Sequence, residues 1–218
     1  MMHGSRRYER GRTTGLLVAA SGDDQHRAPR DGKDEMGGLR TAFAALAGHG
    51  PRARLAERAA AYLGERLSAD YVVMARYAPR DVSSDVVPLV VLGPHGVLVV
   101  EPRDEEGALV CYQDHWYRRT GPGISHPLSD SPSKRARANA ARVKSDLASG
   151  GFIYTPVEGV VVLTRGQPDD VGSSCVPVIA GMDGLVRHLE AHTRRDSSTE
   201  HTHALVGALS GPIRLVTT

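Results

Sequence analysis

A glutamate and an arginine stand two residues apart at the end of an apolar run in this chain. Glu101 closes the run GVLVVE, Arg103 follows it, and the turn sequence Gly-Pro-His-Gly comes before it at 93–96. If residues 96–101 form a strand, side chains two positions apart lie on the same side of it. A carboxylate there can bind a cation, whereas a guanidinium stays protonated and suits phosphate contacts. A solvated edge glutamate is the plainer alternative.

Basic residues form the second group with chemical potential. Lys134, Arg137 and Lys144 lie near one stripe of a helix expected over 132–148, opposite its alanines, and Arg135 flanks them. No acidic residue interrupts this face, so it suits the phosphates of nucleic acid. A merely solvated basic face is the alternative, because the helix carries no aromatic residue for stacking.

The other candidates are weaker. Tyr117 could stack on a base, while Trp116 is expected to pack inside the domain. His188 and His192 have the i, i+4 spacing of a helical metal pair but lack an evident third ligand. We find no phosphate loop, dinucleotide-binding glycine pattern or nucleophile elbow.

Composition favours one globular domain with a polar tail. The 218 residues are 40% hydrophobic and 24% charged, and 27 basic residues nearly balance 25 acidic ones. The dominance of arginine over lysine, with abundant alanine and glycine, is typical of a GC-rich bacterial genome. No apolar run is long enough for a membrane span, and Cys111 and Cys175 lack metal-ligand spacing, which favours a cytoplasmic protein with free thiols. We expect residues 1–36 to be a disordered tail and 37–218 to be a single domain.

Hydrophobic spacing predicts the elements that position these residues. Helices are expected at 39–48, 51–67, 132–148, 184–192 and 203–209, and strands at 71–77, 86–92, 96–101, 108–112, 115–119, 157–164 and 175–180. A Pro-, Ser- and Gly-rich connector is expected at 120–131. The predicted buried stripes are Leu55, Ala59, Tyr62, Leu63 and Leu67 in one helix, and Ala136, Ala140, Val143 and Leu147 in another. This order predicts an α/β domain built on a mixed central β-sheet, with helices on both faces.

The succession of motifs resembles a known family. Ala56-Glu57-Arg58, DYVVM, VVLGPHGVLVVEPR, Gly107, Trp116, SPSKRARANAARVKSDL and VVVLT are similar in kind and order to the nuclease-related domain, NERD. The resemblance covers about residues 52–193. NERD is similar to the PD-(D/E)XK nucleases, so it implies a restriction-endonuclease-like core.

The resemblance also implies site residues for phosphodiester hydrolysis with Mg²⁺ or Mn²⁺. Glu101 matches the glutamate of the family's strand, and Glu57 matches the glutamate of its first helix. The family's metal-binding aspartate falls at Pro88, which offers no ligand. Its lysine falls at Arg103, which can bind phosphate but is a poor general base. The glutamine of its later helix falls at about Arg135.

Two aspartates could supply the missing carboxylate. Asp85 lies three positions before Pro88, on the wrong side of a regular strand unless a bulge intervenes, and Asp81 lies further away. Lys134 or Lys144 could supply an amine from the facing helix. Glu101 and Asp85 are therefore the metal ligands of a rearranged site, if one exists.

Three functions remain open. The interpretation that the two changed motif positions favour is a domain that keeps the nuclease fold, has lost or nearly lost hydrolysis, and acts as a nucleic-acid-binding or interaction module. Alternatively, it is an active metal-dependent nuclease that uses Glu57, Glu101, Arg103 and a displaced aspartate. A domain that binds only a protein partner is the third.

Overall fold

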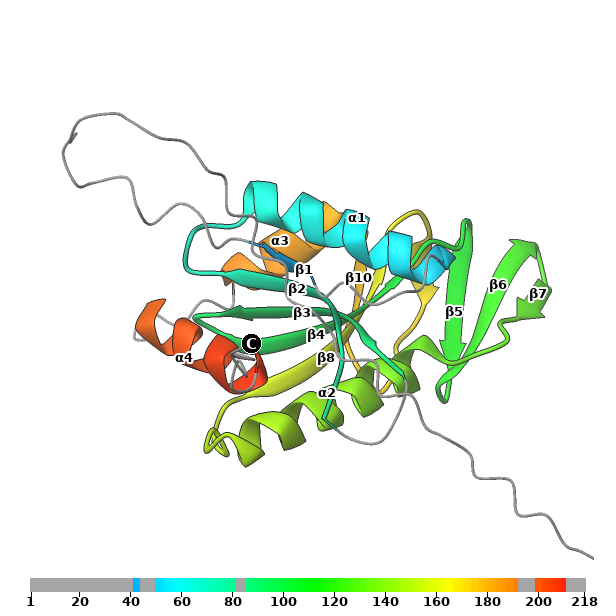
Figure 1. The fold of residues 1–218 in the computed structure, drawn as a ribbon. Coiled ribbons are helices and arrows are strands. Elements are labelled where there is room, and N and C mark those ends of the chain that lie inside the picture. The colour runs from blue at the N-terminus through cyan, green and yellow to red at the C-terminus, as the bar shows by residue number, and fades with distance from the viewer. Residues whose placement is uncertain (1–40, 44–49, 81–84, 192–198, 211–218) are drawn as a thin grey trace, which may run out of the picture.

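The computed structural model describes residues 41–43, 50–80, 85–191 and 199–210. Its main feature is a six-stranded mixed sheet in the order β1-β2-β3-β4-β8-β10 (Figure 1). The strands are β1 (Thr41–Phe43), β2 (Val72–Tyr77), β3 (Val87–Gly93), β4 (Gly96–Arg103), β8 (Val157–Leu163) and β10 (Val178–Ala180). β2, β3 and β4 form an antiparallel meander, whereas β1, β8 and β10 each run parallel to their neighbour. The prediction of a mixed central sheet is confirmed.

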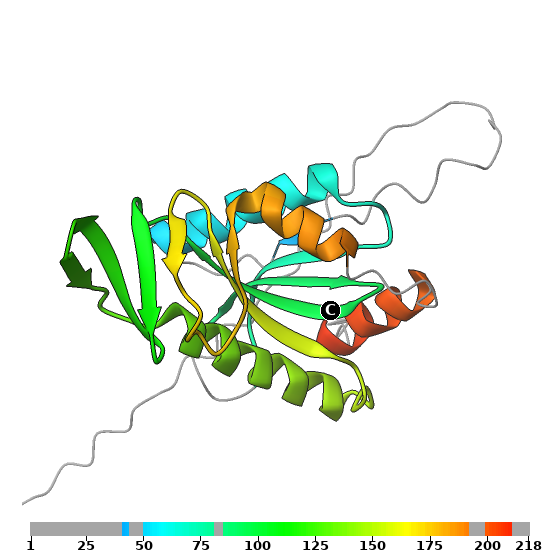
Figure 2. The ribbon, with the colours of Figure 1, turned by 180° about the vertical axis from the view of Figure 1, so that it is seen from behind.

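Helices cover both faces of this sheet, as the sequence predicts (Figures 1 and 2). α1 (Pro51–Arg66) and α3 (Gly181–Ala191) lie on one face, and α2 (Pro132–Ser149) and α4 (Thr199–Ser210) lie on the other. Pro51 and Pro132 each open a helix, where the missing N–H costs nothing. The predicted stripes of α1 and α2 are buried except for Tyr62, which is partly buried. Helix spacing therefore identified which faces pack on the sheet.

A second, four-stranded sheet in the order β7-β6-β5-β9 extends from one end of the domain. It consists of β5 (Ala108–Tyr112), β6 (His115–Gly121), β7 (Ile124–Pro127) and β9 (Gln167–Asp170). Trp116 is buried where this sheet meets the main one, and its Nε1–H donates to Ser133 Oγ of α2 at 2.9 Å. The expectation that Trp116 packs is confirmed.

Three local predictions are wrong, and one strand was missed. Residues 41–43 form a strand, not the helix predicted over 39–48, because pairing with β2 overrides the helix propensity of alanine; the other residues of that prediction lie outside the described ones. The connector expected at 120–131 contains β7, and β9 was not predicted at all. The strand predicted at 175–180 begins only at Val178. The hairpin strands predicted at 108–112 and 115–119 are confirmed as β5 and β6, and they lie in the small sheet.

Gly159 explains how closely α2 approaches the sheet. It lies in β8, and a Cβ atom built on it would come within 2.7 Å of the carbonyl oxygen of Ala136 in α2. Only glycine permits that approach. The first turns of α2 are thereby held beside β4, which β8 pairs in parallel.

No helix within the described ranges is long and apolar enough to cross a membrane. The predicted tail at 1–36 lies outside those ranges.

Candidate functional site

Pro88 and Glu101 occupy adjacent positions on neighbouring strands. β3 and β4 pair from Gly93↔Gly96 to Leu89↔Val100, and one further step of this register places Pro88 opposite Glu101. The resemblance to NERD assigns the metal-binding aspartate to the position of Pro88. Pro88 carries no carboxylate, so this position of the register places a pyrrolidine ring, and not a second acid, next to Glu101.

The strands are irregular at Pro88. Arg76 lies across from it in β2, between the pairs Ala75↔Leu89 and Tyr77↔Val87, and has a φ of 57°. Pro88 has no N–H to donate to β2. Arg76, with its left-handed backbone, shifts the alternation of side chains along β2 by one residue. Val72 and Tyr77 consequently pack on the same face although their numbers differ by five.

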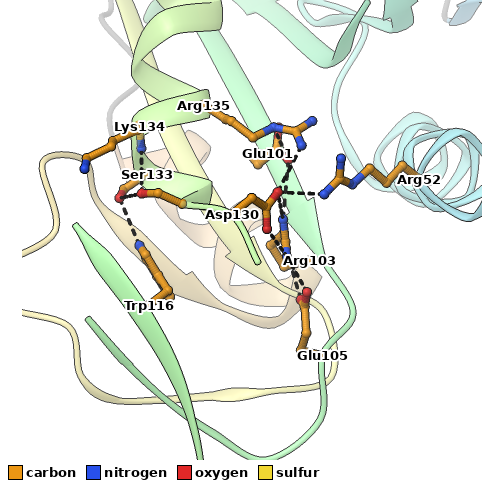
Figure 3. A network of polar contacts seen from close by, with 10 residues as sticks. Arg52, Glu101, Arg103, Glu105, Trp116, Asp130, Ser133, Lys134 and Arg135 are labelled. Atoms are coloured by element: carbon orange, nitrogen blue, oxygen red, sulfur yellow. Dashed lines mark hydrogen bonds and ion pairs between the residues drawn. The ribbon is translucent and has the colours of Figure 1, made fainter. Parts of the chain in front are cut away.

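Glu101 is buried, with 2% of its surface exposed, and it faces cations (Figure 3). Its Oε1 lies 3.4 Å from Arg135 Nε and 4.0 Å from Arg103 Nη1. Its Oε2 accepts no hydrogen bond from the described residues. Burial raises the pKa of Glu101 above its ordinary value, although the charges of Arg135 and Arg103 pull it down.

Arg103 is held by carboxylates on two sides. Its Nε donates to Glu105 Oε2 at 3.0 Å and its Nη2 also donates to Glu105 Oε1, while Nη1 and Nη2 each donate to Asp130 at 3.0 Å. Burial lowers the pKa of Arg103, but these two carboxylates outweigh it and raise the pKa above its ordinary value. Arg103 is a permanent cation in this site, which agrees with its expected unsuitability as a base.

Asp130 accepts hydrogen bonds from arginines of three elements, and its role was not predicted from the sequence. It accepts from Arg52 Nη2 of α1 at 2.6 Å and from Arg135 Nη1 of α2 at 3.0 Å, in addition to Arg103 of β4. Burial raises its pKa, but the hydrogen bond from Arg103 and the three arginine charges lower it below the ordinary range. Its only sequence signal is its place before Ser131, the N-cap of α2, which indicates a helix start but no partner.

The other predicted carboxylates lie elsewhere. Glu57 is in α1 and forms an ion pair with Arg76 at 3.5 Å. Asp85 is exposed and precedes β3, and its backbone carbonyl accepts a hydrogen bond from Arg142 Nη2 at 2.8 Å. The pairs Ala75↔Leu89 and Tyr77↔Val87 keep one register on both sides of Pro88, so the bulge that Asp85 would need is absent there, and Asp85 lies outside β3. Asp81 lies outside the described residues.

The predicted basic face of α2 is exposed at Lys134, Arg137 and Lys144. Arg135 differs from them, because it is half-buried and turned toward Glu101 and Asp130. Tyr117 on β6 is partly buried. The structure therefore divides the four predicted basic residues between two places: three line the outside of α2, and one belongs to the ion cluster.

The described residues contain no group of three or more His, Cys, Asp and Glu side chains arranged to hold a metal ion. His188 lies in α3, and its predicted partner His192 lies outside the described residues. Cys111 and Cys175 are free thiols.

The residues around Glu101 do not fit the Mg²⁺ or Mn²⁺ that the resemblance implies. Such ions need several oxygen ligands, and neither Val161, which pairs with Glu101 in β8, nor Pro88, at the next position of the β3 register, offers a carboxylate. The free Oε2 could accept a cation, but two guanidinium groups lie within 4.0 Å of the same carboxylate. These fixed positive charges would repel a divalent cation that approached the same carboxylate. Arginine charge takes the place of metal charge here.

Fold and site together define a nuclease-like α/β domain whose central carboxylate is surrounded by arginines. A family model described as nuclease-related domain, NERD, matches residues 52–164, which is 113 of the 218 residues. The chain belongs to the NERD family. Comparisons with curated proteins and with solved structures give no match.

Proposed function

We propose that this NERD domain binds nucleic acid through the outer face of α2 and does not hydrolyse it. One observation carries the proposal: Glu101, with Pro88 as its cross-strand neighbour, faces Arg103 and Arg135 instead of a second carboxylate. Hydrolysis of a phosphodiester requires a cation to polarise the phosphate and activate water. Arg103 and Arg135 supply fixed positive charge beside Glu101, but they cannot bind and activate a water molecule as a metal ion does.

The binding surface consists of Lys134, Arg137 and Lys144. Arg137 and Lys144 are seven residues apart, so they lie on one side of α2, about 10 Å apart at 1.5 Å per residue. Residues 132–145 contain no acid, and the acidic neighbour that the structure gives this face is Asp114, whose pKa the charge of Lys134 helps to lower. The binding face has no exposed aromatic side chain, so backbone contacts that ignore base sequence are expected. The core that presents this face is, on this proposal, of the PD-(D/E)XK type.

The test uses the full chain with linear double-stranded and single-stranded DNA, in Mg²⁺ and in Mn²⁺. We expect binding that weakens with salt, no cleavage, and loss of binding in Lys134→Ala/Arg137→Ala. Glu101→Gln, which keeps the size of the side chain, is the matched control for cleavage. Cleavage by the parent and none by Glu101→Gln would establish the active-nuclease alternative instead. Absence of salt-dependent binding would favour the domain that binds only protein.

A further inference from the structure

Three guanidinium groups converge on the single carboxylate of Asp130. Its Oδ2 accepts from Arg52 at 2.6 Å, from Arg103 at 3.0 Å and from Arg135 at 3.0 Å, and its Oδ1 accepts from Arg103 at 3.0 Å. Three donors on one oxygen exceed the two lone pairs of a carboxylate oxygen. The arginines are thus arranged for an anion with more acceptor atoms than Asp130 has.

Arg52, Arg103 and Arg135, called here the arginine cup, surround Asp130 and differ in exposure. Arg103 is the most buried of the three, with 8% of its side chain exposed. The exposed fraction is 33% for Arg135 and 58% for Arg52. Asp130 enters from the loop before α2 and keeps 21% of its side chain exposed (Figure 3). An anion from solvent can therefore reach the same donors from the side of Arg52.

Two helices begin at this cup. α1 starts at Pro51 and α2 at Pro132, and neither has an acidic residue in its first turn, where Arg52 and Arg135 stand instead. Basic side chains at a helix N-terminus are unfavourable unless an anion lies nearby. Asp130 supplies that anion from within the chain.

We propose that Arg52, Arg103 and Arg135 form a phosphate-binding site and that Asp130 occupies it as an internal competitor. A phosphate group offers more acceptor oxygens than a carboxylate and matches the forked geometry of arginine. Arg52, Arg103 and Arg135 balance Glu101, Glu105 and Asp130 in charge, so departure of Asp130 leaves one positive charge for the ligand. The ligand is a free phosphate compound or the terminal phosphate of a nucleic-acid strand.

This site is separate from the exposed face of α2 on which the proposed function rests. Its affinity for phosphate is reduced by the fraction of molecules in which Asp130 has left the cup. Removing the carboxylate should therefore strengthen phosphate binding, whereas loss of the α2 face should weaken DNA binding alone.

The experiment measures binding of pyrophosphate to the full chain by calorimetry, with sodium chloride at matched ionic strength as the blank. We expect Asp130→Asn to bind pyrophosphate about tenfold or more tighter than the parent, as expected when a competitor occupies the site in about nine-tenths of the molecules. Asp130→Asn/Arg52→Gln should lose this gain. Asp130→Asn/Arg58→Gln, which removes an exposed charge elsewhere on α1, should keep it. No gain in Asp130→Asn, or a gain that survives Arg52→Gln, overturns the proposal.

If Asp130→Asn fails to fold, a second measurement on the parent and on Arg52→Gln tests the proposal instead. Pyrophosphate should then raise the melting temperature of the parent and raise that of Arg52→Gln much less; equal shifts overturn the proposal. The source of the phosphate is decided with two oligonucleotides that differ only in a 5′-phosphate or a 5′-hydroxyl. Tighter binding of the phosphorylated strand by Asp130→Asn indicates a strand terminus, and equal binding together with pyrophosphate binding indicates a small phosphate compound.

Discussion

The regular register of β3 and β4 runs from Gly93↔Gly96 to Leu89↔Val100, and its next position sets Pro88 against Glu101. An aspartate at position 88 would place two carboxylates at neighbouring positions on adjacent strands, which are about 4.5–5.5 Å apart at Cβ. The present proline leaves Glu101 with arginines as its charged neighbours. The charges around Glu101 therefore depend on a few side chains, of which Arg103 and Arg135 are the nearest cations.

The first prediction restores a metal site. Pro88→Asp/Arg135→Gln removes one cation from Glu101 and adds a carboxylate beside it. Without metal the variant should melt at a lower temperature than the parent, because two buried carboxylates repel each other. Mn²⁺ should raise its melting temperature, by the equivalent of about 2.7 kcal/mol when the metal is at about 100 times its Kd.

Thermal melts with Mn²⁺ and with EDTA check this prediction. The parent should melt at the same temperature in both, and Pro88→Asp/Arg135→Gln/Glu101→Gln should lose the response to Mn²⁺. A parent whose melting temperature rises with Mn²⁺ and falls back in EDTA would contradict our account of the site.

The second prediction concerns salt. Each phosphate contact contributes about 0.9 to the slope of log K against log salt concentration on duplex DNA. Lys134→Ala/Arg137→Ala should therefore lower that slope by about 2 and weaken binding at low salt. Fluorescence anisotropy over a salt series measures both quantities. Arg58→Ala/Arg66→Ala, on α1 at the other face of the sheet, is the matched control; a similar loss in that variant would mean that overall charge, and not the α2 face, drives binding.

The third prediction is acid sensitivity. The folded-state pKa of Asp130 is below its ordinary value of about 3.9, so its contribution to stability is complete above that value and is lost as the pH falls through the lower folded-state pKa. Glu105, whose pKa is also lowered, acts in the same direction. Stability of the parent should fall below about pH 4.5 more steeply than that of Asp130→Asn. Urea denaturation across pH 2–6 measures it, with the exposed Asp104→Asn as control; parallel curves for parent and Asp130→Asn would refute the assigned role.

The fourth prediction tests the contact that places α2. Gly159→Ala puts a methyl group 2.7 Å from the carbonyl oxygen of Ala136, so α2 must move or β8 must bend. We expect a loss of about 1–3 kcal/mol in the free energy of unfolding, typical of overpacking. Gly172→Ala, where nothing lies within 4 Å of the new Cβ, should be nearly neutral. Chemical denaturation compares the two, and equal effects would show that the close approach is unimportant.

The fifth prediction concerns a buried hydrogen bond between the sheet and α2. The hydroxyl of Tyr77 donates a hydrogen bond to Asp146 Oδ2 at 2.6 Å. Burial of the ring is the larger cause, and this hydrogen bond the smaller one, of the raised pKa of Tyr77. The contribution of this hydrogen bond to the free energy of unfolding is therefore complete below about pH 10, the ordinary pKa of tyrosine. It is lost only as the pH rises above that value. Tyr77→Phe leaves Asp146 Oδ2 with the backbone N–H of Arg80 and should cost about 1–3 kcal/mol at neutral pH. A change in unfolding free energy within about 0.5 kcal/mol would contradict this.

Much of the main sheet could be predicted because its signals are local. The apolar runs around Gly93–Gly96 indicate a hairpin by their length and turn residues, and β3 and β4 follow them. The stripes of α1 and α2 follow from helical periodicity. The small sheet was only half predicted, because β7 and β9 are short, polar and exposed and gain their structure from pairing with β6 and β5.

The sequence alone predicts helices α1 and α2 with their buried faces, strands β2 to β6 and β8, and the closeness of Glu101 to Arg103, since two residues on the same side of a strand must lie together. The tertiary structure decided which charges surround Glu101. Arg52, Asp130 and Arg135 come from α1, a loop and α2, up to 83 residues apart in the chain (52 to 135), and they meet only because two helices on opposite faces of the sheet begin at the same end of it. Such contacts depend on packing across elements, and no local pattern of residue types encodes them.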